Sequence, residues 1–140
     1  QKPIPLFDDY GHHPNEIEAV LSTLRGTFPM NRLIVIFQPH RYSRTRDLFN
    51  EFVSCLSKVD VLILLNIYSA NEAPINTISS STLADSIRRR SSIDPIVAKN
   101  SSEIVEILPN VVTENDVILS LGAGDVHKIP QQLKNHFAIN

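Results

Sequence analysis

The sequence predicts a doubly wound α/β domain, in which a mostly parallel sheet carries helices on both faces. Two observations lead to this prediction. Short, continuous apolar runs rich in β-branched residues are typical of strands buried on both faces. These runs alternate about five times with segments whose apolar residues recur at helical spacing, the pattern expected when helices connect parallel strands.

The length and composition fit one domain and exclude several classes of protein. A chain of 140 residues can bury about two thirds of its unfolded surface in one core. Charged residues make up 20% and the net charge is -2, which argues against disorder and against a strongly basic nucleic-acid-binding protein. The longest apolar runs are far shorter than the roughly 20 residues that cross a bilayer. We therefore expect no membrane partner.

The single cysteine, Cys55, excludes an internal disulfide. It lies within a helical apolar pattern, where a buried and unreactive thiol is expected. The first residues lack the charged region, apolar run and cleavage site of a signal peptide. These features predict a cytoplasmic domain without a disulfide.

The first half of the chain predicts three strands separated by two helices. A short strand ends near Asp8. Pro14 suits the first turn of a helix that ends near Gly26 and Pro29. The apolar run 33–37 is the second predicted strand, a helix follows from Ser43 to Val59, and the run 61–65 is the third strand.

The second half begins with a long polar loop, 66–81, and continues with a helix that ends in three arginines, 88–90. A short strand is predicted at 95–98 and a helix start at 101–103. Another buried strand spans 117–121. A turn at 122–124 then leads into a last helix, and the apolar face of this helix carries Ile129, Leu133 and Phe137.

Most of the unusual polar residues lie where predicted strands end. Ligands of doubly wound folds bind at the carboxyl ends of the strands. The four segments at these ends are 8–14, 38–46, 66–74 and 122–127. We therefore expect a binding site built from these loops.

The first of these segments is a dense run of acidic, aromatic and imidazole groups, from Asp8 to Pro14. A carboxylate can accept ribose hydroxyls, a tyrosine ring can pack on a base or sugar, and neutral imidazoles can bond polar ligand groups. The alternative is a capped helix start with solvated histidines. A zinc site is disfavoured because His12 and His13 are adjacent and no third ligand stands at a familiar spacing.

The second segment places His40 and three arginines at a strand end and a helix start. Arg41 and Arg44 can converge on a carboxylate or phosphate, helped by the helix N-terminal amides. Because cations oppose the dipole at this end of a helix, an anionic ligand is one expected compensation. The alternative to ligand binding is that the arginines pair with neighbouring acids on a solvated face. We expect this alternative to hold for Arg46.

The remaining segments are less informative. The polar loop 68–74 is compatible with binding and equally with a plain connection. The turn 122–125 resembles half of a dinucleotide fingerprint but lacks the third glycine and the later acid, which disfavours a nicotinamide enzyme. Close backbone approach to a ligand or a neighbouring domain is a further hypothesis for this turn. The arginines 88–90 are expected to remain solvated at a helix end.

Four segments together resemble the C-terminal domain of the Mur ligases, and most closely the branch that joins L-alanine to UDP-N-acetylmuramate. They are DDYGHHP (8–14), FQPHRYSRTR (37–46), YSANEAP (68–74) and LGAG (121–124). The resemblance implies a Rossmann-like fold in a three-domain, ATP-dependent and magnesium-dependent ligase of peptidoglycan synthesis, which serves cell-wall formation, cell shape and division. It implies activation of the lactyl carboxylate as an acyl phosphate, followed by attack of the alanine amine.

The chain, residues 1–140, resembles only the third domain of such a ligase. It contains no G-x-x-x-x-G-K-[ST] sequence to cradle a triphosphate. The resemblance therefore implies that UDP-sugar-binding and central P-loop domains lie elsewhere, and that this domain is inactive alone. The absence of an initiator methionine at Gln1 favours the same expectation.

The resemblance also implies roles for individual residues. Asp9 and Tyr10 are expected to contact the nucleotide, and Asp9 its ribose, while His12 lines the cleft between nucleotide and substrate. Arg41 and Arg44, with His40 beside them, are expected to bind the alanine carboxylate. The weaker candidates are His13, Tyr68, Glu72 and the turn Gly122–Gly124. The loop that carries Glu72 departs from the family pattern, because Ala70 and Asn71 precede the glutamate where relatives often have glycine.

No residue of this chain stands out as a general base, another catalytic group or a metal ligand. Two alternatives to the alanine ligase remain at this stage. One is the related murein peptide ligase, and the other is a free-standing module that binds a small anion or a nucleotide without catalysis.

Overall fold

The computed structural model, which describes residues 4–134, contains one sheet of five parallel strands. The strand order across the sheet is β1-β5-β2-β3-β4. The strands are β1 (Leu6–Asp9), β2 (Arg32–Phe37), β3 (Val61–Leu65), β4 (Ile96–Ala98) and β5 (Asp116–Leu121). The predicted parallel α/β fold is confirmed.

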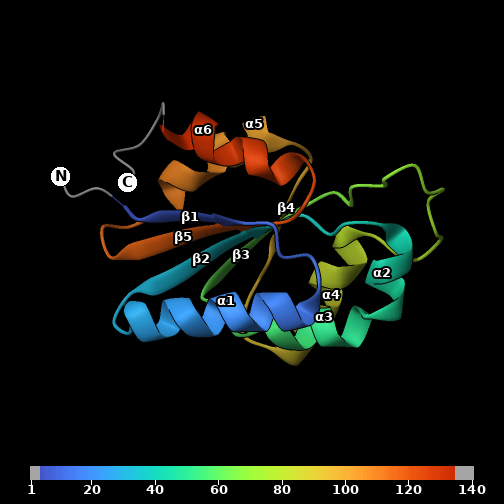
Figure 1. The fold of residues 1–140 in the computed structure, drawn as a ribbon, viewed down its shortest axis with the longest axis horizontal. Helices are drawn as coiled ribbons and strands as arrows, with labels where there is room; N and C mark the ends of the chain where they lie inside the picture. The colour runs from blue at the N-terminus through green and yellow to red at the C-terminus, as the bar shows by residue number, and fades with distance from the viewer. Residues whose placement is uncertain (1–3, 135–140) are drawn as a thin grey trace.

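Helices cover both faces of the sheet, as predicted. One layer holds α1 (Pro14–Thr27), α3 (Phe49–Leu56) and α4 (Ser80–Arg90), and the other holds α5 (Ser101–Ile107) and α6 (Ile129–Lys134) (Figure 1). Shorter elements are α2 (Tyr42–Asp47), η1 (Leu108–Asn110) and η2 (Asp125–Lys128). Within residues 4–134, no helix combines the length and apolar character that crossing a membrane requires.

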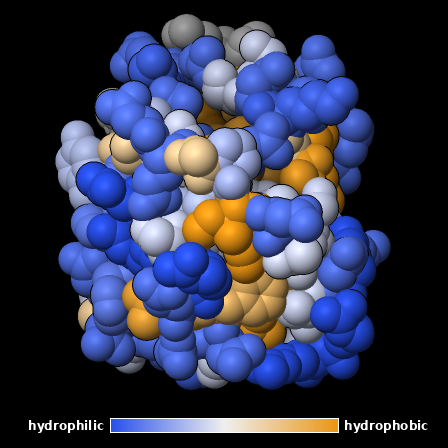
Figure 2. Space-filling model, turned by 90° about the vertical axis from the view of Figure 1, so that its right-hand side faces the viewer, coloured by the Kyte–Doolittle hydropathy of each residue, from blue (hydrophilic) through white to orange (hydrophobic). Residues whose placement is uncertain are grey.

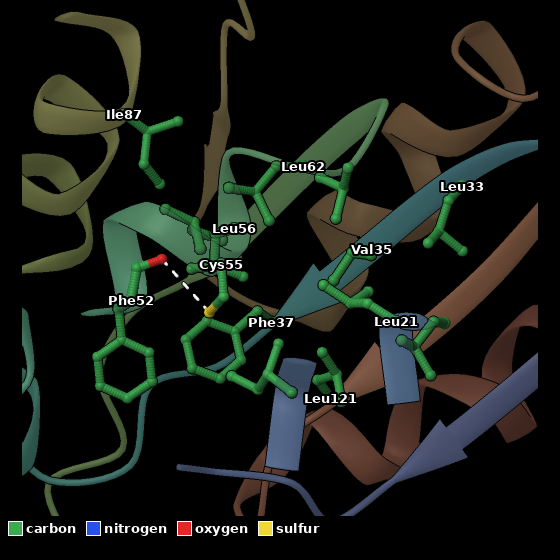
Figure 3. Close-up of a cluster of buried hydrophobic side chains, with 14 of the residues drawn as sticks. Leu21, Leu33, Val35, Phe37, Phe52, Cys55, Leu56, Leu62, Ile87 and Leu121 are labelled. Carbon is green, nitrogen blue, oxygen red and sulfur yellow. Dashed lines mark hydrogen bonds between the residues drawn. The ribbon is translucent and has the colours of Figure 1, made fainter. Parts of the chain in front are cut away.

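The sheet separates two apolar cores because successive strand residues point to opposite faces. In β2, Val35 and Phe37 pack toward α1 and α3, whereas Ile34 and Ile36 pack toward α5 and α6. Figure 3 shows the first core, in which the Cys55 thiol donates to the carbonyl oxygen of Phe52 at 3.6 Å. Cys55 is buried, as predicted, and burial raises the pKa of its thiol to about 12, which favours the protonated form at neutral pH.

The strand order has one consequence for function. Strand β5, the last in the chain, lies between β1 and β2, with Asp9 and Phe37 both opposite Leu121. The loops that follow β1 and β2 therefore flank the end of β5.

The structure corrects the predicted helix 43–59. It forms two helices, α2 and α3, because Leu48 leaves helical geometry with φ -114° and ψ 23°. Leu48 and Phe49 still pack partly against the first core, so the apolar pattern continues across the break. Periodicity therefore could not reveal it.

Two predicted boundaries also change. The last helix begins with the 3₁₀ turn η2, and α6 carries Ile129 and Leu133 into the second core. Phe137, predicted on the same face, lies outside the described residues. The long loop ends at Ser79, whose side chain caps α4 by accepting from the Thr82 N–H.

A buried carboxylate joins two strands at the opposite end of the sheet from the candidate site. The Asp116 side chain is fully buried and accepts two bonds from Arg32, at 2.8 and 2.7 Å, and one from the Thr113 N–H at 2.7 Å. Burial acts to raise the pKa of Asp116, but the bonds from Arg32 and Thr113 outweigh it and hold the pKa below its ordinary value.

We expect this carboxylate to make the domain sensitive to acid. A carboxyl whose pKa is lower in the folded than in the unfolded chain stabilises the fold above about pH 4, and this contribution is lost as the pH falls further. The free energy of unfolding in urea, measured between pH 6 and 3, should fall more steeply for the wild type than for Asp116→Asn. The exposed Asp47→Asn is the control. Parallel profiles for wild type and Asp116→Asn would contradict the assignment.

Candidate substrate-binding site

The strand-end loops predicted to bind ligands lie at one end of the sheet. Of the four predicted segments, three contain the loops 10–13 after β1, 38–41 after β2 and the first part of 66–79 after β3, and the fourth, 122–127, follows β5. Figure 2 faces this end of the molecule and shows apolar residues at the surface between polar ones. Tyr10, exposed to 65%, and Tyr68, exposed to 37%, belong to these loops.

His12, His40 and Tyr68 form a column of rings across three loops. The ring centroids of His12 and His40 are 5.7 Å apart, and those of His40 and Tyr68 are 5.3 Å apart in a stacked arrangement. His12 follows β1 and His40 follows β2, so the two rings meet over the end of the intervening β5. The structure thus brings together two predicted site residues and the weaker candidate Tyr68.

The loops after β2 and β3 are joined by backbone hydrogen bonds beyond the strands. His40 and Tyr68 form a parallel bridge, the Tyr68 N–H donates to the Pro39 carbonyl at 2.8 Å, and the Arg41 N–H donates to the Tyr68 carbonyl at 2.8 Å. Arg41 is held at φ 76° and ψ 138°, a conformation that costs about 1–3 kcal/mol for a residue other than glycine. Such strain is typical of functional positions that the surroundings hold in place.

Arg44 lies against His40. Its Nη1 is 3.1 Å from His40 Nδ1 and also donates to the His40 carbonyl at 3.1 Å. A guanidinium only donates hydrogen bonds, so Nδ1 accepts and the ring proton belongs on Nε2. Burial and then the charges of Arg44, His12 and Arg41 lower the pKa of His40, which keeps the ring neutral at neutral pH.

The other arginines of this helix start differ in their surroundings. Arg41 is exposed, and its positive charge lowers the pKa values of both His40 and Glu72. Arg46 is paired with Asp47 at 2.8 Å on the surface, as predicted. The candidate clamp therefore consists of Arg41 and Arg44, without Arg46.

Glu72 supplies the negative charge that the sequence attributed to a ligand. One of its oxygens accepts from the Ser43 N–H at 3.0 Å, and the other accepts from the Ser43 hydroxyl. The two bonds from Ser43 lower the pKa of Glu72. The dipole of α2 is thus partly compensated within the chain, and the anionic ligand stays a prediction. Ser43 and Glu72 are 29 positions apart in the chain, so local sequence patterns could not predict their contact.

The segment 8–14 divides into binding candidates and a helix cap. Asp9 Oδ1 accepts from the Gly11 N–H at 2.7 Å. His13 is the N-cap of α1, its Nδ1 accepts from the Asn15 N–H at 3.2 Å, and Glu16 accepts from the His13 N–H at 3.1 Å. The capped-helix alternative is therefore right for His13. A capping box with histidine was missed because its usual first residue is serine or threonine.

The turn 122–124 approaches its own chain closely. A Cβ on Gly124 would lie 2.7 Å from Tyr68 Cγ and 2.8 Å from Gln38 Oε1. Gln38 is buried, accepts from the Val126 N–H at 3.0 Å and donates to the Asn66 carbonyl at 3.1 Å. The glycines therefore allow close contact with Gln38 and Tyr68, and approach to a ligand or another domain stays a hypothesis.

The chemistry of these loops suits an anion and polar ligand groups. Across residues 4–134, His, Cys, Asp and Glu side chains form no group of three or more that could hold a metal ion. The cations Arg41 and Arg44 offer several donors, and the neutral His40, which contacts Arg44, offers one more.

The family described as "Mur ligase, glutamate ligase domain" matches residues 1–124. The chain belongs to this family. The resemblance seen in the sequence is therefore confirmed. The loop and helix start that carry Arg41 and Arg44 belong to a Mur ligase domain.

Curated relatives of this Mur ligase domain carry the name UDP-N-acetylmuramate–L-alanine ligase. One from Vesicomyosocius okutanii is 60% identical over 96% of this chain, and one from Methylococcus capsulatus is 55% identical over 93%. The chain covers only 29% and 28% of these two proteins.

Solved structures support the fold of the Mur ligase domain. A UDP-N-acetylmuramate-alanine ligase from Thermotoga maritima matches with a TM-score of 0.70 and 24% identity, over 94% of this chain and 27% of the other. A murein peptide ligase from Psychrobacter arcticus matches with a TM-score of 0.66 and 19% identity, over 93% of this chain and 26% of the other.

Proposed function

We propose that this chain is the C-terminal domain of a UDP-N-acetylmuramate–L-alanine ligase, an enzyme of peptidoglycan synthesis whose UDP-sugar-binding and P-loop domains lie elsewhere in the protein. The observation that carries the proposal is the pair Arg41 and Arg44 beside the neutral His40. The names of relatives at 55–60% identity favour the alanine ligase over a murein peptide ligase.

In this proposal, the two arginines bind the carboxylate of L-alanine. Guanidinium groups make charge-assisted bonds to carboxylates, and two of them fix its orientation. The Arg44 guanidinium is already held by His40, and the backbone of Arg41 is held by its N–H bond to Tyr68. His40 Nε2–H is a further donor at the same place. Orienting the alanine directs its free amine toward the activated sugar carboxylate and lowers the entropic part of the barrier.

The nucleotide would be contacted from the first loop. Asp9 uses Oδ1 in its own turn, which leaves Oδ2 for a ribose hydroxyl, and the exposed ring of Tyr10 lies next to it in sequence. ATP with Mg²⁺ supplies the phosphoryl group that activates the carboxylate of UDP-N-acetylmuramate. We assign the magnesium ligands to the P-loop domain, as the resemblance to the Mur ligases implies.

The proposal is tested by reconstitution. The purified chain is mixed with a fragment that carries the remaining domains of the ligase, and phosphate release is measured with and without UDP-N-acetylmuramate and L-alanine. We expect release that depends on both substrates. The same two fragments joined as one chain provide the control for weak docking. If the joined chain has no alanine-dependent activity, the proposal is wrong.

We expect Asp9→Asn in the full-length ligase to raise the KM for ATP about tenfold. Asparagine retains the Oδ1 that accepts from Gly11 but removes the charge, and a hydrogen bond to a charged group contributes about 1.5–3 kcal/mol. The KM for L-alanine should stay within about twofold. Asp8→Asn is the matched control, because the Asp8 carboxylate accepts from Ser120 at 2.6 Å on the strand β5. A defect confined to alanine would count against a nucleotide role for Asp9.

A further inference from the structure

Helix α2 carries the two candidate arginines at its start but has no cap from its own sequence. Its N-cap residue is Arg41, whose side chain makes no capping bond. The first amides of a helix need acceptors from outside the helix. Among the described residues, Glu72 meets this need at Ser43.

We propose that Glu72 is a positioning residue for the amino-acid substrate, because it holds the first turn of α2 and thereby the geometry of Arg41 and Arg44. This inference rests on the proposed function. Glu72 does not itself contact alanine in this scheme, since both of its oxygens bind Ser43.

The path from Glu72 to the arginines is short. Ser43 lies between Arg41 and Arg44 in the first turn of α2. The Arg41 carbonyl accepts from the Thr45 N–H at 3.2 Å and from the Thr45 hydroxyl at 2.8 Å. Because Arg41 has a strained backbone, loss of order in this turn would let it relax and move its guanidinium.

A tight turn aims Glu72 at Ser43. The Glu72 N–H donates to the Ser69 carbonyl at 3.0 Å, and the two intervening residues, Ala70 and Asn71, have φ 51° and 69°. The same loop carries Tyr68, which bonds the backbone of Pro39 and Arg41. The loop after β3 therefore contacts the segment that carries the arginines at two points. Tyr68 bonds the loop before α2, and Glu72 bonds the first turn of α2.

Charge supports the same role. Arg41, Arg44 and the N-terminal end of α2 are all positive, and the carboxylate of Glu72 reduces their mutual repulsion. The same contacts favour the charged form of Glu72, because the bonds from Ser43 and the positive charge of Arg41 each lower its pKa. Glu72 thus contributes both hydrogen bonds and a counter-charge.

The test uses Glu72→Ala and Glu72→Gln in the full-length ligase. A tenfold change corresponds to about 1.4 kcal/mol, which lies within the range of about 0.5–2 kcal/mol for loss of a helix cap. We expect Glu72→Ala to raise the KM for L-alanine about tenfold, with the KM for ATP within about twofold of wild type. Glu72→Gln retains an acceptor for the Ser43 N–H, so it should restore most of the loss and leave a rise of about threefold.

Glu103→Ala is the matched control. Glu103 accepts from the Lys99 N–H at 3.0 Å at the start of α5, on the other face of the sheet, and should leave the KM for alanine unchanged. The positioning role is overturned if Glu72→Ala leaves the alanine KM unchanged, or if it raises the KM values for alanine and ATP equally. Arg41→Ala in the same assay separates the two claims. If Arg41→Ala also leaves the alanine KM unchanged, the proposed carboxylate site itself is wrong.

Discussion

Replacing Arg41 by alanine in the full-length ligase should raise the KM for L-alanine by about two orders of magnitude. In our proposal, the substitution removes charge-assisted bonds to the substrate carboxylate. Such bonds contribute about 1.5–3 kcal/mol each, and about 1.4 kcal/mol corresponds to a factor of ten. The KM for ATP should change little, because Asp9 and Tyr10 contact the nucleotide in our proposal.

Alanine is a suitable replacement at this position because it retains a Cβ. The strain at φ 76° is therefore similar in variant and wild type, whereas glycine would relieve it and change the backbone as well. Arg46→Ala is the control, since Arg46 is exposed and paired with Asp47. Steady-state kinetics with alanine and ATP varied separately would give the two KM values. An alanine KM within threefold of wild type would exclude Arg41 from the carboxylate site.

Gly122→Ala should destabilise the domain by about 2–6 kcal/mol. Gly122 has φ 143°, a conformation that other residues rarely adopt, and such strain costs about 1–3 kcal/mol. The added Cβ would also lie 2.6 Å from Val126 Cγ1 and 3.0 Å from the Gln38 carbonyl oxygen. Forcing a methyl group into a packed region typically costs a further 1–3 kcal/mol. Urea unfolding followed by circular dichroism measures the difference.

Gly26→Ala is the matched control for the same chemical change. No atom lies within 4 Å of the position that its Cβ would occupy. Gly26 lies within α1, where alanine is favoured over glycine by about 0.5–1 kcal/mol. We therefore expect opposite signs for the two substitutions. Equal effects on the free energy of unfolding would show that the turn at Gly122 relaxes around a side chain.

Much of the fold follows from local patterns. The strands 33–37 and 61–65 are continuous apolar runs because both of their faces are buried, and the first helix begins at Pro14 as predicted. The break at Leu48 escaped prediction because residues on both sides of it still contact the core. Periodicity reports which side chains are buried, and it does not report a change in helix direction.

Much of the candidate site also follows from the sequence, but the roles of several neighbours do not. The ends of the strands already pointed to Asp9, His12, His40 and Arg44. Glu72 was only a weaker candidate without an assigned role, and Gln38 was given no role, because each acts through partners far away in the chain. In the sequence, a glutamate in a polar loop cannot be distinguished from a solvated acid. Only the fold shows that Glu72 lies beside the start of α2.

The sequence by itself determined the class of fold, the family and the segments in which the site residues lie. These depend on burial patterns and motifs that are local in the chain. Only the tertiary structure decided that β5 lies between β1 and β2, which brings His12 and His40 together over its end. It also decided that Glu72 holds the arginine-bearing helix. Both depend on strand order and long-range packing, because residues distant in sequence interact only once the chain is folded.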